Sequence, residues 1–143
     1  VLGDIGGLGV LDAFAGSGAL SFEAVSRGAA RVLAIDNDRA AQKTIAANIA
    51  ALGLNRQIKL IKASASAWLQ TNPDVSFAVV LCDPPYDNLQ PDLLERLAGR
   101  VKPDGLLVVS WPGNLGLPTL TGLTLIERKN YGDITLVFFG NQA

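Results

Sequence analysis

The sequence predicts an α/β fold in which a mostly parallel sheet carries helices on both faces and a hairpin closes the chain. Short apolar runs alternate with longer amphipathic stretches, as strand-then-helix units do, and we expect five such units. The last two apolar runs flank Asn130-Tyr131-Gly132-Asp133, a turn sequence typical of an antiparallel hairpin. A chain of 143 residues that is 49% hydrophobic and 17% charged has the composition of one globular domain.

The expected elements follow from these patterns in chain order. Apolar runs predict strands and helical spacing of apolar residues predicts helices, while Asp38 and Gly53 are residue types that begin and end a helix. We expect strands over residues 8–13, 31–35, 57–61, 77–82, 105–110, 123–128 and 134–139. We expect helices over residues 19–27, 38–52, 64–70 and 91–100, and an irregular segment or a single turn over residues 112–118.

Composition excludes several site chemistries. The absence of histidine removes histidine general bases, triads and metal ligands, and the single cysteine, Cys82, excludes a disulfide or a cysteine zinc cluster within the chain. The net charge is −1, and the sequence has no run of basic residues that would indicate a nucleic-acid partner. Residues 1–9 lack the charged and apolar regions of a signal peptide and no apolar run has membrane-spanning length, so we expect a cytoplasmic protein.

A glycine turn follows the first predicted strand. Gly16 and Gly18 allow positive φ and let a ligand approach the backbone closely, and the helix beyond them offers amides to an anionic group. Asp36 follows Gly16 by 20 residues, at the end of the next strand, where doubly wound folds place a ribose-binding carboxylate. Together these residues predict an adenosine-type cofactor.

The residues around this turn favour S-adenosylmethionine over a dinucleotide. The dinucleotide fingerprint needs Gly or Ala at position 21, where Ser21 stands. Asp12 would repel a pyrophosphate, whereas it would attract the ammonium and sulfonium of S-adenosylmethionine. The alternative for Asp12 is a structural role as a cap of the turn.

A second motif, Asp83-Pro84-Pro85-Tyr86, follows the fourth predicted strand. The prolines fix φ and end the strand, so the chain turns stiffly at the carboxyl edge of the sheet. Asp83 and the Pro84 carbonyl can accept the two N–H groups of an exocyclic amine, and Tyr86 can stack on the base. These contacts would free the nitrogen lone pair to attack a sulfonium methyl without metal or histidine. The alternative is a rigid proline turn with Asp83 as a cap and Tyr86 as surface packing.

Both motifs together resemble the class I S-adenosylmethionine-dependent methyltransferases, and the chain is similar to the RsmD-like bacterial 16S rRNA guanine-N2 methyltransferases. The similarity covers nearly the whole chain, and the residues that carry it are 10–20, 23–29, Asp36, Asn48, 83–86 and 131–133. The resemblance implies a Rossmann-like fold with a seven-stranded sheet whose last strand is antiparallel. It implies that residues 1–143 form a single S-adenosylmethionine-dependent methyltransferase domain.

The resemblance also implies roles for individual residues. Asp36 would hold the ribose hydroxyls and Asn37 would lie beside the adenine. Ser64 and Ala65 stand where family members tend to have Asp-Ala, so the adenine contact is expected to be weaker or made by backbone. The residues that would contact the methionine end of the cofactor are Asp12, Phe14, Ala15, Gly16, Ser17 and Gly18. The residues that would hold the target guanine amine are Asp83, Pro84, Pro85 and Tyr86, and Asp83 would also border the cofactor.

Substrate and partners follow from the same resemblance. We expect a monomer that acts on rRNA or the small ribosomal subunit, with neither a metal nor a membrane. Family members carry a basic segment before the first strand, and this chain has no methionine and starts at Val1, so we expect a fragment that folds but binds RNA and cofactor less well. Residues 128–131, expected in the hairpin loop, are the candidate RNA contact.

Other functions remain open at this point. Asp-Pro-Pro-Tyr serves adenine N6 of DNA or RNA equally well, whereas enzymes that methylate protein glutamine usually carry Asn first. A non-catalytic nucleotide- or cofactor-binding module and a nucleotide-dependent oxidoreductase are further alternatives.

Overall fold

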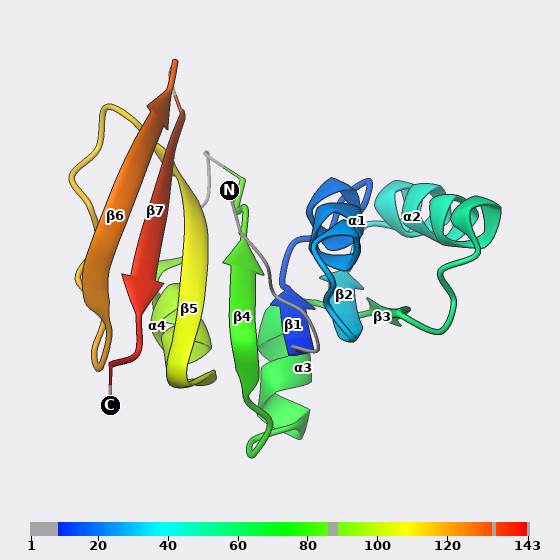
Figure 1. The fold of residues 1–143 in the computed structure, drawn as a ribbon, viewed down its shortest axis with the longest axis horizontal. Coiled ribbons are helices and arrows are strands. Elements are labelled where there is room, and N and C mark those ends of the chain that lie inside the picture. The colour runs from blue at the N-terminus through cyan, green and yellow to red at the C-terminus, as the bar shows by residue number, and fades with distance from the viewer. Residues whose placement is uncertain (1–8, 86–88, 133, 143) are drawn as a thin grey trace. The chain divides into compact units, whose positions relative to one another are not determined.

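The computed structural model describes residues 9–85, 89–132 and 134–142, and it divides into two compact units, Val1–Pro73 and Asp74–Ala143. In the first unit three parallel strands lie in the order β3-β2-β1 (Figure 1). Its elements are β1 (Gly9–Asp12), α1 (Ala19–Ser26), β2 (Arg31–Asp36), α2 (Arg39–Leu52), β3 (Ile58–Lys62) and α3 (Ala65–Thr71).

The carboxyl ends of the three strands share one edge of the first unit. Asp12 pairs with Ala34, and Asp36, two residues further along β2, pairs with Lys62. Helix α1 contacts β1 and β2, and α2 contacts β3. The buried side chains that form the core of these strands and helices are Val10, Leu11, Val32, Ile35, Ile45, Ile49 and Ile58. Because the strands are parallel, Asp12, Asp36 and the glycine turn lie at the same edge of the sheet.

Helix α2 has both predicted ends. The Asp38 carboxylate accepts the Ala41 N–H at 2.9 Å, which satisfies one of the amides that a helix start leaves without a partner. Gly53 has φ +68° and ends the helix in the left-handed conformation. Between them, Ile45 and Ile49 lie four residues apart and bury the same helix face.

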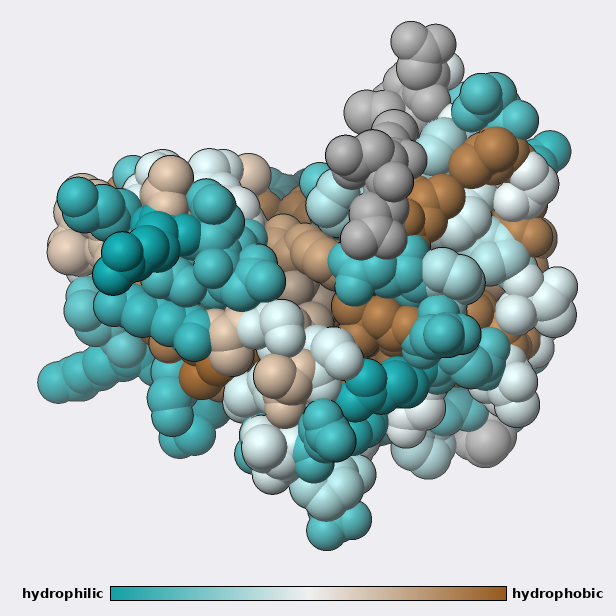
Figure 2. All heavy atoms as spheres, turned by 180° about the vertical axis from the view of Figure 1, so that it is seen from behind, coloured by the Kyte–Doolittle hydropathy of each residue, from teal (hydrophilic) through white to brown (hydrophobic). Residues whose placement is uncertain are grey.

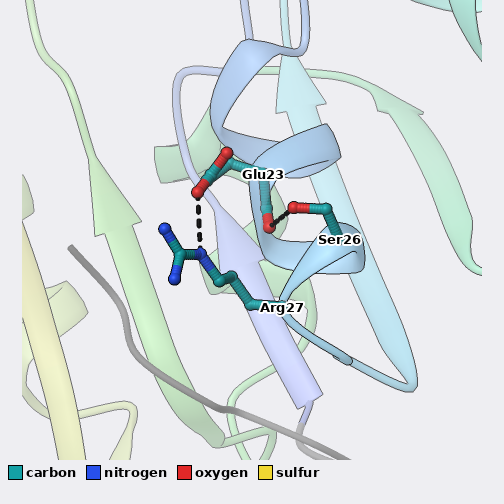
Figure 3. A network of polar contacts seen from close by, with 3 residues as sticks. All are labelled: Glu23, Ser26 and Arg27. Carbon is teal, nitrogen blue, oxygen red and sulfur yellow. Dashed lines mark hydrogen bonds and ion pairs between the residues drawn. The ribbon is translucent and has the colours of Figure 1, made fainter.

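Residues 23–29, which match the family in sequence, form the end of α1 and the turn after it. Arg27 Nε contacts Glu23 Oε1 at 2.8 Å, and Ser26 Oγ donates to the Glu23 carbonyl at 2.8 Å (Figure 3). Gly28 takes φ +99° and the Ala29 N–H donates to the Ala24 carbonyl, which stops the helix. The Arg27–Glu23 pair is exposed to solvent, and such i,i+4 pairs contribute only about 0.3–0.5 kcal/mol.

The second unit combines a parallel pair with an antiparallel hairpin. Its strands lie in the order β4-β5-β7-β6, with β4 parallel to β5 and β7 antiparallel to both of its neighbours (Figure 1). Pro91 begins α4 in the first turn, where its missing N–H costs nothing, and Leu93, Leu94 and Leu97 bury one face. Its elements are β4 (Phe77–Cys82), α4 (Pro91–Ala98), β5 (Val101–Pro112), β6 (Thr124–Tyr131) and β7 (Ile134–Gly140).

Two sequence predictions about the second unit are wrong. No helix follows β5 within the described residues, so the expected fifth strand-then-helix unit is absent, whereas residues 112–118 are irregular as predicted. Residues 128–131 lie in β6 rather than in a loop, because Tyr131 pairs with Ile134 and leaves only Gly132 and Asp133 between the strands. The hairpin is tighter than the turn sequence suggested, and Asp133 lies outside the described residues.

Two further side chains of the second unit lie in its core. Cys82 is buried at the end of β4, and Trp111 is buried with its indole N–H donating to the Gly116 carbonyl at 3.0 Å. Both are core residues rather than reactive or base-stacking groups. No helix in the described part of the chain has the length and apolarity to cross a membrane.

Candidate active site

Asp12 stands at the end of β1 as a fully buried carboxylate. Ser21, in the third position of α1, is also fully buried, and its hydroxyl donates to Asp12 Oδ2 at 2.8 Å. Hydrogen bonds to a charged group contribute about 1.5–3 kcal/mol, so Ser21 fixes this carboxylate firmly. Ser21, which departs from the dinucleotide fingerprint, therefore has a structural role: it holds the Asp12 side chain in place.

The glycine turn is held by hydrogen bonds within the first unit. The Gly16 N–H donates to Asp36 Oδ2 at 2.8 Å, and the Gly18 N–H donates to the Ala15 carbonyl at 2.8 Å. In a dinucleotide-binding loop such amides face the pyrophosphate. Here two of them are already bonded inside the protein, which makes the turn a poor phosphate cradle.

The two glycines of the turn have different surroundings. Gly16 has φ +57°, and a Cβ there would meet nothing within 4 Å, so this side of the turn is open. Gly18 has φ +91°, and a Cβ there would come within 2.8–2.9 Å of Ile45 and Phe22. Gly16 is thus open for a ligand, whereas Gly18 lets the turn pack against α2.

Asp36 is the centre of the polar contacts at this edge. Besides the Gly16 amide, its carboxylate accepts the Asp38 N–H at 2.9 Å, and its backbone carbonyl accepts from Gln42 Nε2 at 2.9 Å. Asn48 Nδ2 donates to the Ser17 carbonyl at 3.3 Å and joins α2 to the turn. Asn48 is among the residues that match the family but has no predicted role, and nothing in the sequence predicts a role for Gln42; polar residues beside the buried Ile45 and Ile49 are the available signal.

The remaining predicted cofactor residues are also placed by the first unit. Phe14 is half-buried, whereas Ser17 and Asn37 are exposed. The Ser64 side chain caps α3 by accepting the Ala67 N–H at 3.1 Å, and Ala65 is buried. The Ser64 hydroxyl thus serves its own helix, and its contact with adenine stays a prediction.

The second predicted motif follows β4 in the second unit. Asp83 is exposed, Pro84 is buried and Pro85 is exposed, while Tyr86 lies outside the described residues. Within the described chain, no donor is hydrogen-bonded to the Asp83 carboxylate. An exposed acid next to a buried proline provides acceptors on a rigid backbone, as contact with an amine requires.

Fold and site define a class of protein. An α/β sheet of seven strands, mostly parallel and ending in an antiparallel pair, carries a glycine turn bonded to an acid 20 residues later. This is the architecture of Rossmann-like proteins that bind nucleoside cofactors, and it confirms the predicted fold class. A solved structure described as a conserved hypothetical protein from Streptococcus pyogenes has the same fold, with a TM-score of 0.87 and 30% identity over 96% of this chain and 88% of that chain.

The family is equally clear. Residues 2–140 match the family described as Conserved hypothetical protein 95, and the chain belongs to this family of RsmD-like methyltransferases. It is 32% identical to ribosomal RNA small subunit methyltransferase D of Haemophilus influenzae over 136 residues, 92% of this chain and 70% of the relative. It is 33% identical to the protein of the same name from Escherichia coli K12 over 140 residues, 93% of this chain and 68% of the relative. The predicted family is therefore confirmed.

Proposed function

We propose that this chain transfers a methyl group from S-adenosylmethionine to an exocyclic nucleobase amine, namely guanine N2 of 16S rRNA. The observation that carries the proposal is the likeness, over more than nine-tenths of the chain, to proteins named ribosomal RNA small subunit methyltransferase D. The choice of guanine N2 rests on the resemblance described above. We propose rRNA or the small ribosomal subunit as partner, a monomeric state and a cytoplasmic location.

The glycine turn supports S-adenosylmethionine as the cofactor. Its amides are bonded to Asp36 and Ala15, and its open side lies at Gly16. A ligand with no phosphate group suits this arrangement better than a dinucleotide. Asp36 would hold the ribose hydroxyls, and Asp12 would attract the positive methionine end across the protein interior.

Residues of the second unit would prepare the nucleophile. When bound, S-adenosylmethionine supplies an electrophilic methyl group and becomes a neutral thioether. The Asp83 carboxylate and the Pro84 carbonyl would each accept one N–H of the guanine amine, which favours a pyramidal nitrogen with a free lone pair. After methylation the nitrogen is cationic, and its surplus proton passes to Asp83 or to water. Tyr86 would stack on the base after it leaves its helix.

The proposal is tested by substituting Asp83. The chain and its Asp83→Ala variant are incubated with methyl-labelled S-adenosylmethionine and naked 16S rRNA, assembled 30S particles or DNA. Loss of the acceptor and proton-accepting group should slow transfer by about a hundredfold or more. Cofactor affinity, measured by calorimetry, should change little.

Asp74→Ala is the matched control, because Asp74 is an exposed acid of the same unit, outside the proposed site. This control should keep full activity. Nucleoside analysis of the product identifies the methylated atom. Full transfer by Asp83→Ala would remove the proposed role of Asp83, and label in adenine would replace guanine N2 with the adenine-N6 alternative. Absence of label from every substrate would contradict the proposed function itself.

A further inference from the structure

The first unit contains a hollow that the proposed methyl-transfer chemistry does not use. Its volume is about 690 Å³, and it lies between one face of α2 and the end of β3. Its lining residues are Arg39, Gln42, Lys43, Ala46 and Lys62. Figure 2 shows hydrophilic residues gathered over the end of this unit that carries α2 and β3.

The fold brings the lining residues of α2 close to Lys62, which lies well beyond them in the sequence. Residues 39, 42, 43 and 46 follow the i, i+3, i+4, i+7 spacing of one helix face, so Arg39 and Lys43 project from the same side of α2. Lys62 is the last residue of β3. Two cations of one helix face and a third from the end of β3 therefore converge on one concavity.

These cations carry net positive charge into the hollow. No ion pair within the described residues involves Arg39, Lys43 or Lys62, and all three are exposed. No acid lines the hollow. Asp36 and Asp38, which directly precede α2, accept backbone N–H groups with their carboxylates, which offsets part of their charge. The amino end of α2 adds its positive dipole end on the same side.

The chemistry of the lining distinguishes this hollow from a pocket for a small apolar molecule. Such pockets are lined mainly by hydrophobic and aromatic side chains, whereas here one alanine stands among three cations and an amide. Arginine, lysine and glutamine are the groups that bind nucleic-acid phosphates and sugars. The hollow also exceeds what one phosphate group fills, which suits a stretch of polynucleotide backbone.

We infer that this hollow binds the phosphate backbone of the RNA substrate beside the cofactor edge. The inference rests on the proposed function, since it names where the first unit holds that RNA. Gln42 connects the hollow to the proposed cofactor edge, because it lines the hollow and also donates to the backbone carbonyl of Asp36. Backbone contacts of this kind position a nucleic acid without reading its sequence.

The test compares two double variants with the same change in net charge. Lys43→Gln/Lys62→Gln removes two cations of the hollow. Lys59→Gln/Lys102→Gln removes two exposed cations elsewhere: Lys59 alternates with Lys62 along β3 and so points to the opposite face, and Lys102 belongs to the second unit. Binding of 16S rRNA is measured against salt concentration by fluorescence anisotropy, alongside calorimetry with S-adenosylmethionine.

The hollow variant should bind rRNA about tenfold more weakly at low salt and lose about 0.7–0.9 from the salt-dependence slope for each phosphate contact removed. The control pair should keep the slope, and both variants should bind S-adenosylmethionine normally. Equal losses in the two variants, or a loss of S-adenosylmethionine affinity in the hollow variant, would overturn the inference. An unmodified chain that neither binds nor methylates rRNA would instead contradict the proposed function.

Discussion

The glycine turn and the Asp83–Pro85 segment reach rigidity by different physical routes. The turn is held by distant partners: the Gly16 amide bonds Asp36 and the Ser17 carbonyl accepts from Asn48. The segment after β4 owes its stiffness to two consecutive proline rings that restrict φ locally. The first region should therefore respond to substitutions far away in sequence, and the second mainly to substitutions within itself.

The largest expected effect on stability is at Gly18. Alanine there places a Cβ against Ile45 and Phe22 at a φ of +91°, so strain and overpacking together should lower the free energy of unfolding by about 2–4 kcal/mol. Gly16→Ala is the matched control, because it brings only the positive φ and should cost about 1 kcal/mol. Chemical denaturation of both variants measures the difference. Equal losses would mean that the turn does not depend on its packing against α2.

Ser21 should give the next effect. Ser21→Ala removes the hydroxyl that donates to the buried Asp12 carboxylate, which should cost about 2 kcal/mol of unfolding free energy. Ser26→Ala in the same helix removes an exposed bond to a backbone carbonyl and should change stability by less than about 0.5 kcal/mol. A loss at Ser21 no larger than that at Ser26 would refute the structural role of the buried bond. Cofactor affinity, measured in parallel, tests whether fixing Asp12 also serves the ligand.

The smallest expected change in stability is in the second region. Pro85 is exposed, so Pro85→Ala should lower the free energy of unfolding by only about 0.4–1 kcal/mol, through added freedom of the unfolded chain. Methyl transfer should fall more than this small loss of stability suggests, because the acceptors beside Asp83 lose their fixed positions. Transfer rates and denaturation curves of the same protein sample give both values. Unchanged transfer would show that this proline does not position the site.

The sequence predicted most elements because local signals and packing agree. Asp38, Gly53 and the spacing of Ile45 and Ile49 define α2 from end to end, and the structure confirms it. The hairpin is where the sequence predicts it, but its first strand runs to Tyr131 and not to residue 128, because strand length there depends on pairing with β7, which local turn residues do not reveal. The acids and glycines of the site stand out as motifs, whereas Gln42 and Asn48 act through partners 6 and 31 residues away that only the fold brings close.

The cations that line the hollow are another feature that the sequence alone does not predict. In the sequence Arg39, Lys43 and Lys62 look like ordinary surface charges, and the pattern predicts the RNA contact at residues 128–131 instead. There Lys129 lies 3.9 Å from Glu127 and above the Phe138 ring, within strand β6. The concavity between α2 and β3 depends on how the helix packs beside the strand, which the sequence pattern does not reveal.

We propose that the glycine turn is built for an adenosine cofactor without phosphate groups. Calorimetric titration of the unmodified chain with S-adenosylmethionine and, separately, with NADH tests it most directly. Because the Gly16 and Gly18 amides are bonded within the protein, saturable binding of S-adenosylmethionine and no binding of NADH are expected. Tight binding of NADH without binding of S-adenosylmethionine would contradict the claim.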